Sequence, residues 1–355
     1  MNAQTPGAGG YLVFETGGTK LVAGVAGSDC RILETRILHR DAADRAPKSL
    51  QRLVEVAREL KTEYERQGGE IQAAGFGFGG IVRRSTQDPF LCLHEQGWEN
   101  VRVVETIERE FGVPVAVEND CKLAALAEAH FGAGVGYRTV FYMTIGTGVG
   151  GGIVRDGRIQ QMSDIGEAEI GHVVVLPDGP PCWCGGRGCV ESICSGPGIR
   201  QLAGYVAAHN VALWKASVLS GKHTEAQHAT SKEMLEAWQA RDRFACKVVE
   251  TAASHLATAI AAAVNLLAPD VFIVGGGVGA GNEQFLELVA GITRPRVVAY
   301  FRDTFRMVPS ALREQVVTQG AAILAYQRTH PNAGRDSPQS LDRILGKDPI
   351  LCEER

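Results

Sequence analysis

The 355-residue sequence lacks several features that define whole classes of protein. It has no basic surplus, because 36 lysines and arginines stand against 40 aspartates and glutamates, for a net charge of −4 with histidine neutral. A basic surplus or a basic stripe is the electrostatic footprint of nucleic-acid binding, so no nucleic-acid partner is expected. No apolar run approaches the ~20 residues that cross a bilayer. The sequence therefore favours neither a nucleic-acid-binding protein nor a membrane protein.

A secretory signal is also missing from the amino terminus. Residues 1–10 are mostly glycine, alanine and polar residues, without the basic start and the apolar stretch of such a signal. We expect a loose tail there and a cytoplasmic protein. The nine cysteines are an odd count, and three of them lie within eight residues. Without an export signal, free thiols or a metal site are expected rather than a disulfide framework.

The residues that are present indicate a globular chain. Hydrophobic residues make up 45% and charged residues 21% of the sequence, which is enough apolar material for a core. At ~150 residues per domain, the length suggests two domains. Glycine accounts for 43 residues, which is roughly 12% against an average near ~7%. Because these glycines are clustered, they predict several tight backbone loops.

Two segments of the sequence share one plan. Residues 11–25 and residues 140–154 each contain an apolar strand, a loop rich in threonine and glycine, and a second apolar strand. Gly17 and Gly146 are 129 residues apart, roughly one domain length. The pattern predicts a duplicated α/β unit. Helical spacing of apolar residues predicts helices over 48–66, 103–111, 121–130, 244–267 and 313–327.

The glycine clusters favour phosphate binding, because backbone N–H groups can surround an anion where glycine permits close approach. Residues 146–151 match G-x-G-x-x-G, but a strand follows them instead of the helix that a dinucleotide-binding fingerprint requires. No G-x-x-x-x-G-K-[ST] sequence occurs. One glycine-rich hairpin alone would be only a turn. Two hairpins and a third cluster at 275–277 favour a nucleotide whose phosphates are held from both sides.

Four residues have the chemistry of a zinc site. Cys182, Cys184 and Cys189 lie on one short glycine-containing loop, and His172 lies ten residues before the first of them. Three cysteines and one histidine form a closed tetrahedral zinc set with no open position, so a structural Zn²⁺ ion is expected. Buried free cysteines are the alternative. The other six cysteines are isolated and are expected in the core.

Three carboxylates are candidates for chemistry. Asp120 follows Asn119 at a predicted strand-to-helix junction, which exposes a rigidly held carboxylate at the end of a sheet. A plain helix cap is the simpler interpretation. Glu169 lies three residues before His172, and Glu191 lies two residues after the last cysteine of the zinc set, so both are tethered to the metal loop. Side chains fixed there suit a polyhydroxylated ligand; surface glutamates are the alternative.

Taken together, these motifs resemble the ROK family of bacterial sugar kinases and repressors. The matching pieces run from Glu15 to Ala325. The most specific piece is E-I-G-H over 169–172 followed by C-x-C-G-x-x-G-C-x-E over 182–191. Beside it stand E-N-D over 118–120, T-I-G-T-G-V-G-G-G over 144–152 and V-G-G-G over 274–277. The resemblance implies a two-lobed actin/hexokinase-like α/β fold, related to ribonuclease H, in which ATP and a sugar meet in a cleft.

The resemblance also implies roles for particular residues. Asp120 would be the general base that takes a proton from the sugar hydroxyl, with Mg²⁺ accompanying ATP. Asp120 would also belong to the sugar site, together with Gly79, Gly80, Asn119, Glu169, His172 and Glu191, of which His172 would bind zinc as well. The phosphates would face Gly17, Gly18, Thr19 and Lys20 and, from the other side, Gly146, Thr147, Gly148 and Gly150. The adenosine would face Gly275, Gly276 and Gly277. A homodimer is expected, because dimers are common among similar proteins.

The expected organisation has two lobes and two tails. We expect a disordered tail over 1–10 and an N-terminal lobe over 11–134 with the first phosphate loop and the catalytic aspartate. A C-terminal lobe over 135–330 would carry the second phosphate loop, the zinc loop and the adenosine site. A polar tail is expected over 331–355.

Two departures from the family pattern bear on the substrate. The first loop begins with Glu15 where the family usually has aspartate, although fructokinase-like members carry glutamate there. After Gly80 the family usually continues with proline and aspartate, whereas this chain has Ile81-Val82-Arg83-Arg84, which changes part of the expected sugar-pocket wall. The C-x-C-G loop, by contrast, favours the branch of glucokinases and N-acetylhexosamine kinases.

The favoured function is ATP-dependent phosphorylation of glucose to glucose 6-phosphate. Phosphorylation of fructose, N-acetylglucosamine or N-acetylmannosamine is the alternative, and the sequence does not separate ATP from polyphosphate as donor. A sugar-responsive repressor would need a helix-turn-helix before Tyr11, where the sequence has ten residues. An inactive sugar-binding protein is disfavoured by the intact Asn119-Asp120 pair.

Overall fold

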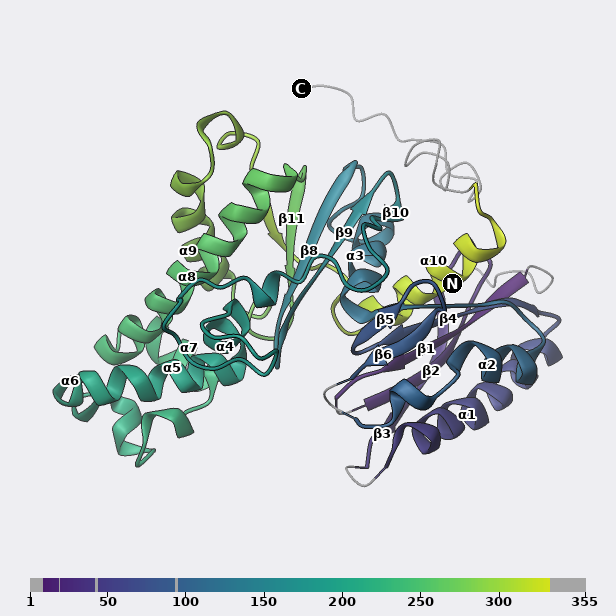
Figure 1. Cartoon of the computed structure of the whole chain (residues 1–355), viewed down its shortest axis with the longest axis horizontal. Helices are drawn as coiled ribbons and strands as arrows, with labels where there is room; N and C mark the ends of the chain where they lie inside the picture. The colour runs from purple at the N-terminus through teal and green to yellow at the C-terminus, as the bar shows by residue number, and fades with distance from the viewer. Residues whose placement is uncertain (1–8, 19, 42–43, 93–94, 333–355) are drawn as a thin grey trace. The chain divides into compact units, whose positions relative to one another are not determined.

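The computed structural model describes residues 9–18, 20–41, 44–92 and 95–332 (Figure 1). These residues form two compact units. Unit 1 comprises Met1–Arg138, Gly152–Glu167 and Glu314–Arg355, and unit 2 comprises Thr139–Gly151 and Ala168–Arg313. The tails expected over 1–10 and 331–355 lie mostly outside the described residues, and 9–10 belong to the first strand.

The main sheet of unit 1 has the strand order β3-β2-β1-β4-β7. Its strands are β1 (Gly9–Thr16), β2 (Lys20–Ala26), β3 (Ile32–His39), β4 (Glu70–Phe78) and β7 (Val115–Asn119). The first three strands pair antiparallel, whereas β4 pairs parallel with both β1 and β7. The register places Thr16, Phe78 and Asn119 side by side. The carboxyl ends of three parallel strands therefore meet at one edge, where ligands of α/β sheets bind.

Helices and a small hairpin complete unit 1. They are the hairpin β5 (Ile81–Arg83) and β6 (Asp88–Leu91), the 3₁₀ turn η1 (Trp98–Asn100), and the helices α1 (Ala46–Arg66), α2 (Val103–Phe111), α3 (Asp120–Phe131) and α10 (Val316–Thr329). The apolar faces of α1 and α2 pack with the sheet around Phe14, Phe76, Phe78 and Trp98, which are fully buried. The yellow helix α10 lies against α3, β4 and β1 (Figure 1).

The second sheet repeats the topology of the first. Its order is β10-β9-β8-β11-β12, so the first strand of the set is again central, with the next two strands on one side and the last two on the other. The strands are β8 (Thr139–Ile145), β9 (Val149–Arg155), β10 (Arg158–Ile159), β11 (Val271–Gly275) and β12 (Met307–Pro309). As in the first sheet, the fourth strand pairs parallel with the first and the fifth. The predicted duplication is confirmed.

Unit 2 contains most of the helices. They are α4 (Val190–Cys194), α5 (Gly196–His209), α6 (Val211–Lys215), α7 (Ser231–Gln239), α8 (Arg243–Leu267) and α9 (Glu283–Thr293). The 3₁₀ turns outside unit 1 are η2 (Ile170–His172), η3 (Val218–Gly221), η4 (Ala226–His228), η5 (Arg294–Arg296) and η6 (Ala299–Phe301), and η7 (Arg313–Gln315) precedes α10. The helices predicted over 48–66, 103–111, 121–130, 244–267 and 313–327 match α1, α2, α3, α8 and α10. Within the described part of the chain, no helix has the length and apolarity to span a membrane.

Candidate functional site

Asn119 and Asp120 lie where β7 ends and α3 begins. Oδ1 of Asn119 accepts hydrogen bonds from the backbone N–H groups of Cys121 (2.9 Å) and Lys122 (3.2 Å), so Asn119 is the N-cap of α3. Its amide nitrogen donates to the Gly80 carbonyl (3.0 Å) and to Oδ1 of Asp120 (3.1 Å). The same Asp120 oxygen accepts from the N–H of Cys121 (2.8 Å). The capping function thus belongs to Asn119, and one oxygen of Asp120 is held in place by its neighbours.

The first glycine loop lies beside Asp120. The N–H of Gly17 donates to the Lys20 carbonyl (2.9 Å) and closes the turn between β1 and β2. The N–H of Gly79 donates to the Thr16 carbonyl (3.0 Å). A Cβ atom on Gly79 would lie 2.7 Å from that carbonyl oxygen and 3.7 Å from Oδ2 of Asp120, so only glycine leaves this space open. Unit 1 therefore brings the loop, the end of β4 and the aspartate together.

Glu15 is a buried carboxylate at the start of this loop. Its Oε1 lies 3.3 Å from Nζ of Lys20, and its buried Oε2 has no hydrogen-bond partner among the described residues. Burial raises the pKa of Glu15, the charge and hydrogen bond of Lys20 oppose that rise, and the charge of Asp120 adds to it. A buried carboxylate oxygen without a protein partner fits Mg²⁺, which takes oxygen ligands and retains water. Of the other predicted loop residues, Gly18 lies between β1 and β2, and Thr19 is outside the described residues.

A buried ion-pair network holds the start of α3. Nζ of Lys122 lies 2.6 Å from Oε1 of Glu167 and 3.5 Å from Oε1 of Glu118. Arg84 donates to the same Glu167 oxygen at 2.7 Å. Burial by itself raises the pKa of Glu167, but the hydrogen bonds and charges of Lys122 and Arg84 outweigh it and hold that pKa below its ordinary value. Glu167 is therefore ionised at neutral pH and balances the charges of both Lys122 and Arg84.

The stretch Ile81 to Arg84, which departs from the family pattern, forms part of this network. Nη1 of Arg83 lies 3.2 Å from Oδ2 of Asp164, and the backbone N–H of Arg84 donates to the Asp164 carbonyl (2.9 Å). These contacts attach Arg83 and Arg84 to Asp164 within unit 1. The two arginines therefore have a structural role in unit 1.

The second glycine loop lies between β8 and β9 in unit 2. The N–H of Gly146 donates to the Gly148 carbonyl (2.9 Å), and the Gly146 carbonyl accepts from the N–H of Gly196 (2.8 Å). Gly196 begins α5, and the side chain of Ser195 caps that helix. The positive end of a helix dipole favours an anion, so the start of α5 adds positive potential beside the loop. The sequence reasoning missed this helix, although a serine cap followed by proline in the first turn is a signal for it.

The third glycine cluster packs on the end of β8. Gly276 has a φ of 79°, which L side chains rarely adopt. The N–H of Val278 donates to the Ile145 carbonyl (3.0 Å), which ties this turn to the residue just before the second loop. Unit 2 therefore gathers both of its glycine clusters. The remaining predicted residues lie in the same turns or at strand ends: Thr147, Gly150, Gly275 and Gly277.

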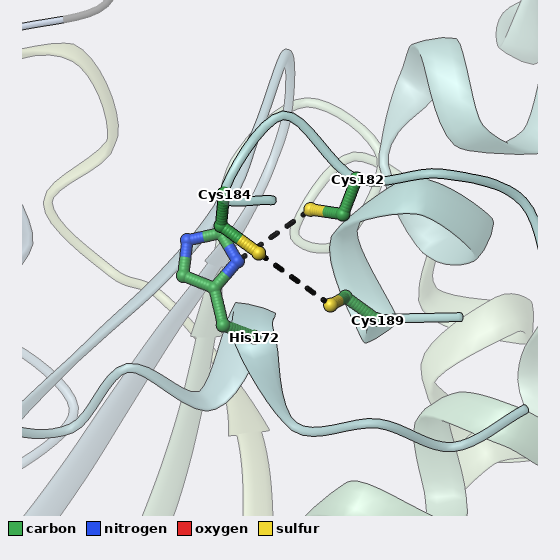
Figure 2. Close-up of side chains that lie close together, drawn as sticks. All are labelled: His172, Cys182, Cys184 and Cys189. Atoms are coloured by element: carbon green, nitrogen blue, oxygen red, sulfur yellow. Dashed lines mark hydrogen bonds between the residues drawn. The ribbon is translucent and has the colours of Figure 1, made fainter. Parts of the chain in front are cut away.

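His172, Cys182, Cys184 and Cys189 point toward one another in unit 2 (Figure 2). Nδ1 of His172 lies 3.7 Å from Sγ of Cys182, and Sγ of Cys184 lies 3.8 Å from Sγ of Cys189. All four ligand atoms lie within 4.8 Å of one another. Ligands at ~2.1–2.3 Å from a tetrahedral zinc ion are about 3.5–3.8 Å apart, so the donor set fits zinc. Burial raises the pKa of Cys189 to about 12, so metal binding must displace its proton.

Trp183 and Glu191 join the zinc loop to the second glycine loop. The indole of Trp183 packs edge-on against the His172 ring at 4.9 Å, and its Nε1–H donates to Oε1 of Glu191. Oε2 of the buried Glu191 accepts from the N–H of Val149 (2.8 Å), and a Cβ atom on Gly148 would lie 2.7 Å from it. Glu191 is thus hydrogen-bonded both to the zinc loop, as its position in the sequence suggested, and to the second glycine loop. Trp183 was not among the predicted site residues.

The predicted sugar-binding residues are divided between the units. Unit 1 groups four of them at the ends of β4 and β7: Gly79, Gly80, Asn119 and Asp120. Unit 2 carries the other three around the zinc loop: Glu169, His172 and Glu191. Glu169 is exposed and precedes η2, which ends at His172.

The repeated strand order, with an aspartate at the start of α3 beside a glycine loop, is typical of an actin/hexokinase-like α/β protein. Comparison with known proteins narrows this class. The sequence profile of the ROK family matches residues 11–328, and the chain belongs to the ROK family.

Individual relatives cover nearly the whole chain. A glucokinase of Thermotoga maritima is 32% identical over 322 residues, which are 88% of this chain and 96% of that protein. The crystal structure of a ROK hexokinase from Thermus thermophilus has a TM-score of 0.75 and 27% identity, covering 91% of this chain and 100% of its own. A ROK family glucokinase from Streptomyces griseus, in complex with glucose and AMPPNP, has a TM-score of 0.69 and 29% identity, covering 90% and 99%.

Proposed function

We propose that the protein transfers the γ-phosphoryl group of ATP to the 6-hydroxyl of glucose. The observation that carries this proposal is the position of Asp120, which Asn119 holds at the start of α3 beside the first glycine loop. The relatives support it: the Thermotoga maritima protein is a glucokinase, and the Streptomyces griseus structure contains glucose and AMPPNP.

Asp120 acts as the general base. Its carboxylate accepts the hydroxyl proton while the sugar oxygen forms a bond to the γ-phosphorus and the bond from that phosphorus to the β-phosphate oxygen breaks, which releases ADP. Asn119 keeps the carboxylate in one orientation through the hydrogen bond to Oδ1. A positioned base contributes ~10²–10⁴-fold. Positioning and charge stabilisation supply most of the remaining acceleration in phosphoryl transfer.

The glycine loops hold the nucleotide. Backbone N–H groups of the loops around Gly17 and Gly146 bind phosphate oxygens, the N-terminus of α5 adds positive potential, and the cluster 275–277 packs against the adenosine. Glu15, whose buried Oε2 has no hydrogen-bond partner among the described residues, would hold Mg²⁺, and the ion would supply positive charge to the phosphates.

The zinc set serves the site structurally. His172 and the three cysteines would hold zinc, and the four bonds would keep the loop closed. Because these four ligands complete a tetrahedral site, the metal would offer no position for substrate. The same loop presents Glu169, His172 and Glu191 to the sugar hydroxyls. A site that pairs each hydroxyl rejects analogues strongly, because its own buried polar groups would be left unpaired.

A screen for formation of sugar phosphate tests the proposal. The zinc-loaded protein is assayed with Mg²⁺ATP, and separately with polyphosphate, on glucose, mannose, fructose, N-acetylglucosamine and N-acetylmannosamine, and the phosphorylated sugar is measured with each donor. We expect the highest kcat/KM with glucose and ATP. A higher kcat/KM with N-acetylglucosamine or N-acetylmannosamine would favour the second candidate function, an N-acetylhexosamine kinase, which the C-x-C-G loop also favours. No phosphorylated sugar with any of the sugars and with either donor would refute a sugar kinase.

A further inference from the structure

A cavity of about 540 Å³ lies in unit 2, between the zinc loop and the helices α5 and α8. Its wall comprises residues of the segment 176–187, of α4, and of the facing sides of the two longer helices. None of the predicted sugar or nucleotide residues lines it. Its size falls within the ~300–1,000 Å³ of small-molecule sites. The cavity is therefore a candidate site distinct from the phosphoryl-transfer centre.

The wall of the cavity is mainly apolar. Leu176 and Pro181 come from the zinc-loop segment, Ile193 from α4, and Leu202 and Val206 from α5. Ligand sites typically combine such a lining with a few polar groups that orient the ligand. A molecule that fills this cavity therefore needs an apolar body.

The charges that line the cavity are predominantly positive. Arg187 and Lys247 line it and form no ion pair among the described residues, and Asp178 is the only acidic residue among its lining residues. Two histidines add hydrogen-bonding groups: Nδ1 of His209 donates to the Tyr205 carbonyl (2.9 Å), and the ring of His255 donates to a backbone carbonyl of the zinc-loop segment. Unpaired guanidinium and ammonium groups beside an apolar wall complement an organic anion.

We propose that this cavity binds a small organic anion, a carboxylate, sulfonate or phosphate ester on an apolar body. The occupant contacts the loop that carries the zinc ligands, because Arg187 lies between Cys184 and Cys189. From there the contact reaches Glu191 and the glycine loop through the hydrogen bonds described above. The bound anion therefore changes the KM for ATP; this consequence rests on the proposed kinase function, whereas the binding itself does not.

The probe for the test is 8-anilinonaphthalene-1-sulfonate, an anion on an aromatic body that fluoresces in apolar sites. We expect saturable binding of one probe per zinc-loaded chain. Lys247→Gln removes one charge-assisted contact and should weaken binding about tenfold. Lys222→Gln, an equal change of charge on an exposed residue of the same unit that does not line the cavity, should leave it unchanged. Thr251→Phe fills the cavity from α8 and should abolish binding.

Zinc content and melting temperature show whether each variant is folded, so that loss of probe binding has one cause. N-phenyl-1-naphthylamine, which lacks the sulfonate, should bind at least tenfold more weakly. Equal binding of the neutral probe, or unchanged binding by the Lys247 and Thr251 variants, would overturn the proposal. A dimer that does not bind the probe, and that the Thr251→Phe substitution dissociates, would also overturn the proposal. In that case a second copy of the chain would cover the cavity. Probe binding with no change in the KM for ATP would retain the site and remove only its effect on turnover.

Discussion

Replacing Glu167 by glutamine removes one charge from the network that holds the start of α3. The Glu167 side chain is 4% exposed, and it is shared by Lys122, which is 6% exposed, and by Arg84. Glutamine has nearly the same shape, so Glu167→Gln leaves both cations in place without the carboxylate between them. The variant therefore measures the electrostatic contribution with little change in packing.

The magnitude follows from burial. Breaking a buried ion pair by removing one partner costs about 3–5 kcal/mol, because the remaining charge is left without compensation. Lys122 keeps Glu118 at 3.5 Å as a second partner. We therefore expect the lower end of that range, a loss of about 3 kcal/mol in the free energy of unfolding of unit 1.

Urea denaturation of the full chain gives this free energy. The fluorescence of the fully buried Trp98 follows unit 1 when Trp183, Trp214 and Trp238, which lie in unit 2, are replaced by phenylalanine in the parent and in each variant. Glu63→Gln is the matched control, because Glu63 lies 2.7 Å from Arg36 but is 43% exposed. An exposed pair contributes about 0–1 kcal/mol, so the control should change little. Equal, small effects of the two substitutions would refute the buried network.

The pH dependence provides a second readout. The pKa of Glu167 is lowered in the folded protein, so its stabilisation is fully present above the unfolded pKa, near ~4.3, and is lost as pH falls through the folded value. The difference in stability between the parent protein and Glu167→Gln should therefore be constant at neutral pH and shrink under acid conditions. A difference that grows as pH falls would contradict the sign.

Three further predictions concern the site. Asp120→Ala should reduce sugar-dependent ADP release by at least about 10²-fold while the melting temperature stays near that of the parent. Elemental analysis should find one zinc per chain, and its removal by a chelator should raise the KM for the sugar. Trp183→Phe keeps an aromatic ring but removes the indole N–H, so the hydrogen bond to Glu191 is lost; such a bond is worth about 1.5–3 kcal/mol when one partner is charged. It should raise the KM for ATP more than the KM for the sugar.

Each of these has a result that would contradict it. Near-normal turnover in Asp120→Ala would remove that residue from the role of base, and purified protein without zinc would remove the metal. Trp214→Phe, on α6, is the control for the Trp183 variant. If both tryptophan variants change the KM for ATP equally, the hydrogen bond from Trp183 to Glu191 does not contribute to ATP binding.

Local patterns in the sequence predicted much of the fold. The strand–loop–strand plan around Gly17 and Gly146 predicted the duplication, because two antiparallel strands and their turn are specified within about fifteen residues. Asn119 was recognisable as a helix start because a cap acts on the N–H groups of the next turn. The zinc site was also recognisable from a local pattern, because three of its four ligands lie on one short loop.

Contacts between distant residues could not be predicted in this way. Arg84 and Glu167 are 83 residues apart, and Val149 and Glu191 are 42 residues apart. Hydrophobic periodicity specifies which face of an element is buried but not which distant side chain meets it. The sequence therefore predicted Glu191 beside the metal loop without its bond to the glycine loop.

The packing of α10 has a consequence for how the chain matures. This helix lies against α3, β4 and β1, although its residues leave the ribosome only after all of unit 2 has been synthesised. During synthesis, the face of the first sheet that α10 covers therefore stays uncovered until α10 emerges. By that time all residues of unit 2 have been synthesised. Unit 2 can thus complete its core first, and release of the last helix sets the moment at which α3, which begins at Asp120, acquires its final support.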